Sequence, residues 1–136
     1  MSKQLTVTAK TAKLDEVLEF IGAILEEADC PMKTKLQLDV AVEEIFVNIA
    51  NYAYGDAEGT AVISADITEN PKAVVIEFRD TGKPFDPLAK PDPDTTLSAA
   101  ERQIGGLGIF MVKKSMDEVA YRYEDSQNIF TMRKLF

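Results

Sequence analysis

Glu44 and Asn48 stand four residues apart in a segment whose apolar residues recur at helical spacing. At about 100° per residue, Asn48 lies about 40° around the helix from Glu44, and Asn51 lies about 20° from Glu44 on the other side. These side chains therefore point away from the apolar stripe of Phe46 and Ile49. A carboxylate and an amide one turn apart can hold an oxygen-ligated Mg²⁺ and activate a hydroxyl group or a water molecule. Taken alone, the pattern also fits an ordinary solvated helix face.

Asp80, Thr81 and Gly82 end a segment rich in Val, Ile and Phe that has the composition of a strand. A carboxylate in this place can accept a hydrogen bond from an exocyclic amine, while a glycine lets a flat ring approach the backbone. Because Asp80 stands at a strand end, we expect it to lie outside the core. Asp and Gly are also common turn residues, so a plain strand-ending turn is the alternative.

A third motif, Gly105, Gly106, Leu107 and Gly108, opens a predicted helix. Free amide groups at a helix N-terminus attract anions, and the helix dipole adds to that attraction. The motif lacks the Gly-Lys-Ser/Thr of a P-loop and does not follow a strand as a dinucleotide fingerprint does. A simple hinge is the alternative interpretation.

The composition excludes several kinds of chemistry. The chain has no histidine and one cysteine, Cys30, so it cannot build a Ser-His-Asp or Cys-His nucleophile, a histidine- or cysteine-ligated zinc site or an intrachain disulfide. Acid–base work therefore falls to carboxylates, lysines or tyrosines, and any metal should be an oxygen-preferring ion such as Mg²⁺.

The charge balance excludes two kinds of partner. The 136 residues carry 15 Lys and Arg against 23 Asp and Glu, a formal net charge of −8. Nucleic acids and anionic membrane surfaces both require a basic face, so we expect neither as a direct partner. With no long apolar run and no apolar region near the start, we expect no membrane span or signal peptide and a cytoplasmic location.

The hydrophobic periodicity predicts strands over residues 3–10, 60–68, 73–80, 117–124 and 128–135, and helices over residues 12–28, 32–54 and 105–116. This order indicates a single α+β domain over residues 1–136, a two-layer sandwich with three helices on one face of a mixed, mostly antiparallel five-stranded sheet. Residues 83–104 hold four of the six prolines, and a loop of this length is usually functional or mobile.

The three motifs, taken in this order, resemble the nucleotide-binding boxes of the Bergerat-fold ATPases, the histidine-kinase-like superfamily. The resemblance rests on EIFVN at 44–48, DTGKPFDP at 80–87 and GGLG at 105–108, and it extends over about residues 14–134. Within that superfamily, the short chain, the FDP triplet and the segment GGLGIFMVKKSMDEVAYRYED resemble the anti-sigma-factor serine kinases.

The resemblance implies a role for each motif residue. Asn48 would ligate Mg²⁺, and Glu44 would be the general base toward a serine hydroxyl. Asp80 would accept from the adenine amino group of ATP, with Gly82 giving the ring access. A lid over about residues 83–104 would be hinged by its terminal glycines and would close on the phosphates, which are contacted by Gly105, Gly106, Leu107 and Gly108.

Two positions depart from the wider superfamily pattern. Tyr52 stands where many relatives have a histidine. How this turn of the helix contacts the phosphates or tunes the general base is therefore left open. Pro84 replaces a second glycine, as is common among the anti-sigma kinases. Lys83 and Arg102 flank the lid and either reach the phosphates or remain solvated.

The leading hypothesis is an ATP-dependent protein-serine kinase that is also an anti-sigma factor in a bacterial partner-switching pathway. Its implied partners are a sigma factor and a small anti-anti-sigma protein of the STAS type, the latter being the phosphoacceptor. The family often forms homodimers, and an exposed edge strand offers a surface for one. An ATP-gated binding module without phosphoryl transfer is the alternative, and a detached histidine-kinase catalytic domain ranks third.

Overall fold

The computed structural model describes residues 2–89 and 106–136. It contains an open antiparallel sheet and three α-helices, in an order that matches the prediction. The strands are β1 (Lys3–Thr8), β2 (Thr60–Thr68), β3 (Ala73–Asp80), β4 (Glu118–Glu124) and β5 (Gln127–Leu135), and the helices are α1 (Leu14–Glu27), α2 (Met32–Tyr52) and α3 (Gly106–Ser115).

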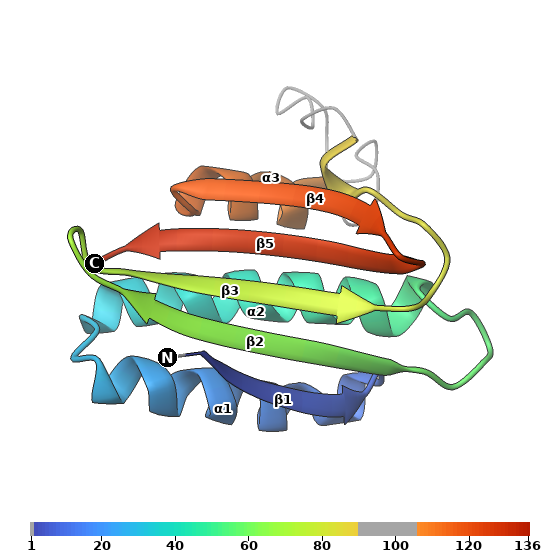
Figure 1. The fold of residues 1–136 in the computed structure, drawn as a ribbon, viewed down its shortest axis with the longest axis horizontal. Helices are drawn as coiled ribbons and strands as arrows, with labels where there is room; N and C mark the ends of the chain where they lie inside the picture. The colour runs from blue at the N-terminus through green and yellow to red at the C-terminus, as the bar shows by residue number, and fades with distance from the viewer. Residues whose placement is uncertain (1, 90–105) are drawn as a thin grey trace.

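The sheet has the strand order β1-β2-β3-β5-β4, so β5 lies between β3 and β4 (Figure 1). All four strand pairings are antiparallel. Within the described residues the sheet is therefore wholly antiparallel, whereas the prediction was a mixed, mostly antiparallel sheet. The turn between β4 and β5 sets the register in which these two strands pair. Asp125 and Ser126 both have positive φ, the combination of a two-residue turn that matches the twist of a hairpin.

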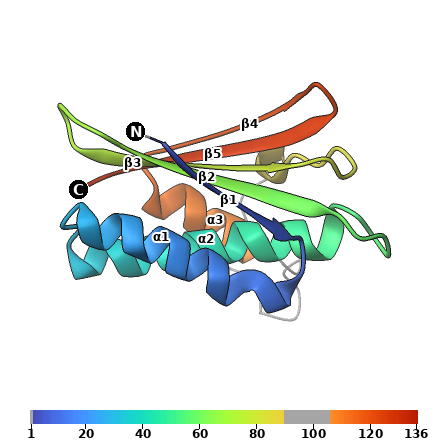
Figure 2. The same cartoon turned by 60° about the horizontal axis from the view of Figure 1, so that its bottom comes forward.

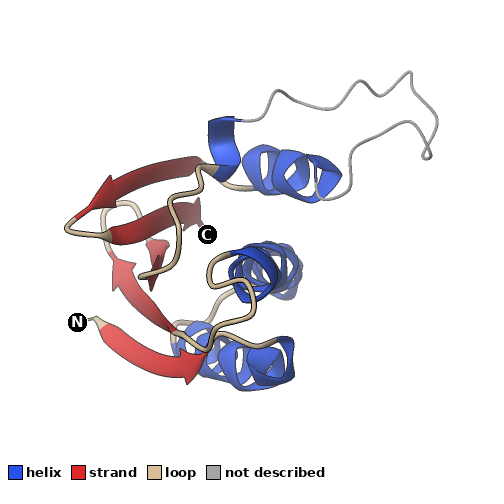
Figure 3. Ribbon diagram, turned by 90° about the vertical axis from the view of Figure 1, so that its right-hand side faces the viewer, coloured by secondary structure: helices blue, strands red, loops and turns tan. Residues whose placement is uncertain are grey.

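The three helices cover one face of the sheet, which confirms the predicted two-layer α+β architecture (Figures 2 and 3). The apolar stripes of α1 and α2 and the inward side chains of the sheet fill the space between the layers. The largest completely buried side chains include Val17, Ile21 and Leu25 of α1, Leu38, Val42 and Phe46 of α2, and Ile63, Ile76, Phe78 and Met132 of the sheet.

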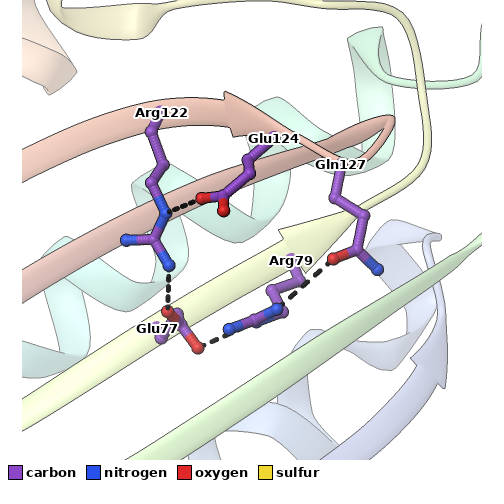
Figure 4. A network of polar contacts seen from close by, with 5 residues as sticks. All are labelled: Glu77, Arg79, Arg122, Glu124 and Gln127. Atoms are coloured by element: carbon purple, nitrogen blue, oxygen red, sulfur yellow. Dashed lines mark hydrogen bonds and ion pairs between the residues drawn. The ribbon is translucent and has the colours of Figure 1, made fainter.

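The opposite sheet face carries a polar network (Figure 4). Arg79 Nε donates to Glu77 Oε2 at 2.9 Å and Arg79 Nη1 to Gln127 Oε1 at 3.3 Å. Arg122 Nε donates to Glu124 Oε2 at 3.0 Å. Strand alternation places these side chains outward while their neighbours enter the core, so this face is polar, and none of the three described α-helices covers it.

The boundaries differ from the predictions by a few residues. The first strand ends at Thr8, because a 3-10 turn over Thr11–Lys13 precedes α1. α1 ends at Glu27 and α2 begins directly after Pro31, where a proline is compatible with a helix start. Most of the predicted lid, residues 90–104, and also Gly105 lie outside the described residues.

Candidate functional site

A cleft lies between the C-terminal half of α2, the end of β3 with the loop that follows, and the β4–β5 hairpin. Its walls are mostly apolar, with a few polar side chains among them. The lining residues are Ile45, Asn48, Ile49, Tyr52, Ala53, Phe78, Asp80, Lys83, Phe85, Pro87, Tyr121, Asn128 and Phe130. Apolar walls with a small number of directed polar groups are typical of sites for a small organic ligand.

Asp80 is buried in this cleft, with 6% of its surface exposed. The expectation that it lies outside the core is therefore wrong, because the loop backbone after β3 and the Asn128 side chain of β5 pack against its carboxylate. Asp80 Oδ1 accepts two hydrogen bonds at 2.9 Å, from the backbone N–H of Gly82 and from Asn128 Nδ2. Burial raises the pKa of the Asp80 carboxyl, and these two hydrogen bonds partly offset that rise.

Gly82 packs against the end of α2. A Cβ on Gly82 would lie 2.1 Å from the backbone oxygen of Ala53, and the N–H of Lys83 donates to that same oxygen at 2.8 Å. A glycine is therefore required here by the close approach of helix and loop backbones. The predicted role in admitting a flat ring stays a prediction.

Asn128, at the start of β5, is a site residue that the sequence reasoning missed. It pairs with Asp80 across the β3–β5 ladder and is equally buried. An asparagine two residues after a hairpin turn resembles an ordinary turn residue, and only the strand register places it beside the carboxylate.

Glu44 and Asn48 lie on one face of α2, as the helical spacing predicts. Asn48 Nδ2 donates to the backbone oxygen of Glu44 at 2.8 Å and lies 3.4 Å from Glu44 Oε1. With its amide nitrogen turned toward Glu44, Asn48 has Oδ1 as the atom suited to a cation. Burial raises the pKa of the Glu44 carboxyl, the Asn48 hydrogen bond lowers it and the nearby Glu43 raises it further.

Gly108 brings α3 against Glu44. A Cβ on Gly108 would lie 2.0 Å from Glu44 Oε1 and Cδ, so the absence of a side chain permits this contact. Asn48 lines the cleft together with Asp80, whereas Glu44, one turn earlier, lies beneath α3. Gly106 and Leu107 begin α3, next to the undescribed Gly105.

Two of the remaining candidates, Tyr52 and Lys83, are among the residues that line the cleft. Tyr52 and Phe85 face each other with ring centroids 6.3 Å apart, and Lys83 is exposed at the rim. Asn51 is exposed on α2, and Arg102 lies outside the described residues.

The donor set around Asn48 fits Mg²⁺ that arrives with a nucleotide. Within residues 2–89 and 106–136, no three His, Cys, Asp or Glu side chains form a group able to hold a metal ion by themselves. Mg²⁺ usually keeps water and phosphate ligands and takes few from the protein, so one amide oxygen beside a carboxylate is a sufficient protein share.

Comparison with known proteins supports this description. The model of the histidine kinase-like ATPase domain matches residues 7–134. The chain belongs to this family. The family match confirms the superfamily resemblance stated from the three motifs, and it implies ATP binding by the histidine kinase-like ATPase domain.

Two curated relatives of the domain are named as kinases. A serine/threonine-protein kinase, BtrW, from Bordetella bronchiseptica is 24% identical over 95% of this chain and 89% of its own length. A serine-protein kinase, RsbW, from Halalkalibacterium halodurans is 27% identical over 96% of this chain and 81% of its own length.

A solved structure supports the same fold for the ATPase domain. The RsbU and RsbW domains of a Mycobacterium tuberculosis protein match 99% of this chain with a TM-score of 0.71 and 14% identity, and this chain spans 32% of that protein.

In the described part of the chain, we find no helix with the length and apolar character needed to cross a membrane.

Proposed function

We propose that this protein is an ATP-dependent protein-serine kinase that acts in the bacterial cytoplasm as an anti-sigma factor of a partner-switching pathway. One observation carries the proposal. Asn48 and Asp80 line the same apolar cleft although they are 32 positions apart, and Glu44 lies one helical turn from Asn48. One helix and one strand end thus hold the residues to which we assign these roles: Asn48 as metal ligand, Asp80 as the purine-reading carboxylate and Glu44 as base.

The cleft has the polarity that an adenine ring requires. Ile45, Ile49, Phe78 and Phe130 provide apolar surface, and Asp80 provides an acceptor for the exocyclic amine. The phosphates would extend past Asn48 toward the N-terminus of α3, where Gly106, Leu107 and Gly108 present backbone amides. We also propose that Gly105 contacts the phosphates and that about residues 83–104 form the lid over them.

Phosphoryl transfer depends mainly on positioning and on neutralisation of charge. Mg²⁺, held in part by Asn48 Oδ1, would supply positive charge to the phosphate oxygens. Glu44 would accept the proton of an acceptor serine while the serine oxygen bonds to the γ-phosphorus and the bond to the ADP oxygen breaks. The raised pKa of Glu44 makes its carboxylate a stronger base than an exposed glutamate.

The names of the relatives support the choice of a protein substrate. Both curated relatives are named as serine or serine/threonine kinases, and each aligns with almost the whole of this chain. We therefore propose a serine of a small anti-anti-sigma protein of the STAS type as the phosphoacceptor and a sigma factor as the second partner.

One observation favours a second function, an ATP-gated binding module without transfer. The backbone of Gly108 lies against the half-buried Glu44 carboxylate and restricts the access of a serine hydroxyl to it. A protein in which this contact persists with ATP bound would change its partner affinity without transferring phosphate.

Incubation with γ-labelled ATP, Mg²⁺ and a STAS-type anti-anti-sigma protein from the same organism tests the proposal. We expect label on a serine of the acceptor, and none when Asn48→Ala replaces the native kinase. Partner binding that depends on ATP, with no label on the acceptor, would establish the binding module instead. The absence of both ATP binding and transfer would contradict both functions.

A further inference from the structure

Asp80 and Asn128 are the two buried polar residues among those that the structure describes. They stand directly opposite each other where β3 ends and β5 begins. Asp80 has its role in the proposed adenine site, whereas Asn128 has none in the phosphoryl transfer itself. A buried amide has to satisfy its hydrogen-bonding capacity, so its partners reveal what it does.

Protein groups use the full capacity of the Asn128 amide. Its Nδ2 donates to Asp80 Oδ1 and to the backbone oxygen of Lys83, both at 2.9 Å, and lies 3.4 Å from the backbone oxygen of Gly82. Its Oδ1 accepts from the backbone N–H of Phe85 at 3.1 Å and from the hydroxyl of Tyr121. Two donor hydrogens and two lone pairs are all that a primary amide has, so Asn128 keeps no strong hydrogen bond for a ligand.

The amide instead fixes the orientation of the Asp80 carboxylate. Both hydrogen bonds to Asp80, from Gly82 and from Asn128, fall on Oδ1. They prevent rotation of the carboxylate and leave Oδ2 as the acceptor that these donors do not use. The same amide also holds the backbone at Lys83 and Phe85, two residues of the cleft wall.

We propose that Asn128 is a positioning residue that determines which purine the cleft accepts. With Asp80 held in one orientation, Oδ2 meets a 6-amino group as acceptor to donor. A 6-oxo purine would place its own acceptor there, leaving a buried carboxylate oxygen without a partner. The inference rests on the proposed function, because it assumes that Asp80 reads the purine edge.

The experiment compares the dissociation constants of ATP and inosine triphosphate, which differ at the 6-position of the ring. We choose Asn128→Leu, which keeps the approximate shape and loses both the donor and the acceptor, and Asn128→Ala, which removes every contact. Gln127→Leu is the matched control, since it makes the same loss of an amide one residue earlier on the outer sheet face (Figure 4). Native protein and Gln127→Leu should prefer ATP by at least about 10-fold, and both Asn128 variants should lose most of that preference.

The ratio of the two constants does not depend on the fraction of active protein, so partial misfolding does not mimic the result. A cooperatively melting Asn128 variant that keeps the native ratio would overturn the proposal. Equal binding of the two nucleotides by native protein would instead contradict the adenine site and with it the proposed function.

A measurement on the native protein covers the case in which neither variant folds. The Asn128 side-chain NH₂ protons should exchange slowly with solvent in the free protein and equally slowly in the ATP complex. Loss of that protection when ATP binds would overturn the proposal, because the amide would then no longer hold Asp80.

Discussion

The two donors that converge on Asp80 make Asp80→Asn an informative substitution. The new amide has to turn its oxygen toward Gly82 and Asn128, which places its NH₂ group where Oδ2 was. An adenine amine would then meet a donor instead of an acceptor. We expect ATP affinity to fall about 10- to 100-fold while the fold is kept. Titration calorimetry with circular dichroism as the control measures this, and unchanged affinity would contradict the assignment of Asp80.

Burial of Asp80 also predicts a pH dependence of stability. Because the folded protein raises the pKa of this carboxyl above its ordinary value, the folded state binds more protons than the unfolded state between those two values. The free energy of unfolding should therefore fall as pH rises through the window just above the ordinary Asp pKa. Asp80→Asn should flatten that part of the curve in urea unfolding at a series of pH values. Identical curves for the two proteins would contradict the burial of a charge at this position.

The sequence predicted the residues whose position depends on local geometry. Glu44 and Asn48 share a face because helical periodicity alone decides it, and the structure agrees. Asn128 was not predictable, because its partner Asp80 is far away in sequence and only the β3–β5 register brings them together. The contact between Gly82 and Ala53 likewise depends on where the end of a helix meets the end of a strand, which no local pattern encodes.

The packing of α3 on α2 predicts an effect for Gly108→Ala. Its new methyl group would compete for space with the Glu44 carboxylate, and a flexible side chain can move aside. We expect the rate of phosphoryl transfer to fall about 10-fold or more, with ATP affinity changed by only a few-fold. Single-turnover assays and nucleotide titration separate the two quantities.

Gly22→Ala in α1 is the matched control for Gly108→Ala. A Cβ on Gly22 would lie 3.7 Å from Lys35 Cε, an ordinary contact, so this change should be neutral or should stabilise the helix by up to about 1 kcal/mol. A native transfer rate for Gly108→Ala would show that the close packing of α3 on Glu44 has no part in catalysis.

The helices and hairpins were predictable as elements, but their arrangement was not. Apolar spacing and turn residues act within a few positions, so each segment could be predicted as helix or strand from its own residues. The observed ends differ from the predicted ends by only a few residues. The insertion of β5 between β3 and β4 follows from pairing over long sequence separations. This arrangement forms the cleft, since it brings the start of β5 beside the end of β3.

The cleft joins α2, β3 and the β4–β5 hairpin, so a nucleotide that fills it should stabilise the protein as a unit. A ligand that binds only the folded state at about 100 times its dissociation constant adds about 2.7 kcal/mol to the free energy of unfolding. We therefore expect ATP with Mg²⁺ to raise the melting temperature by several degrees, and Asp80→Asn to lose most of that shift at equal ligand concentration. An equal shift with GTP would contradict adenine recognition.

The most direct test of phosphoryl transfer by this protein is a paired measurement on Glu44→Gln. The amide has almost the shape of the carboxylate and cannot take a proton, while Asn48 and Asp80 remain in place. We predict that ATP affinity stays within a few-fold of native and that the rate of transfer to the acceptor serine falls about 10²-fold or more. If Glu44→Gln transfers phosphate as fast as the native protein, Glu44 is not the base and the account of this site is wrong.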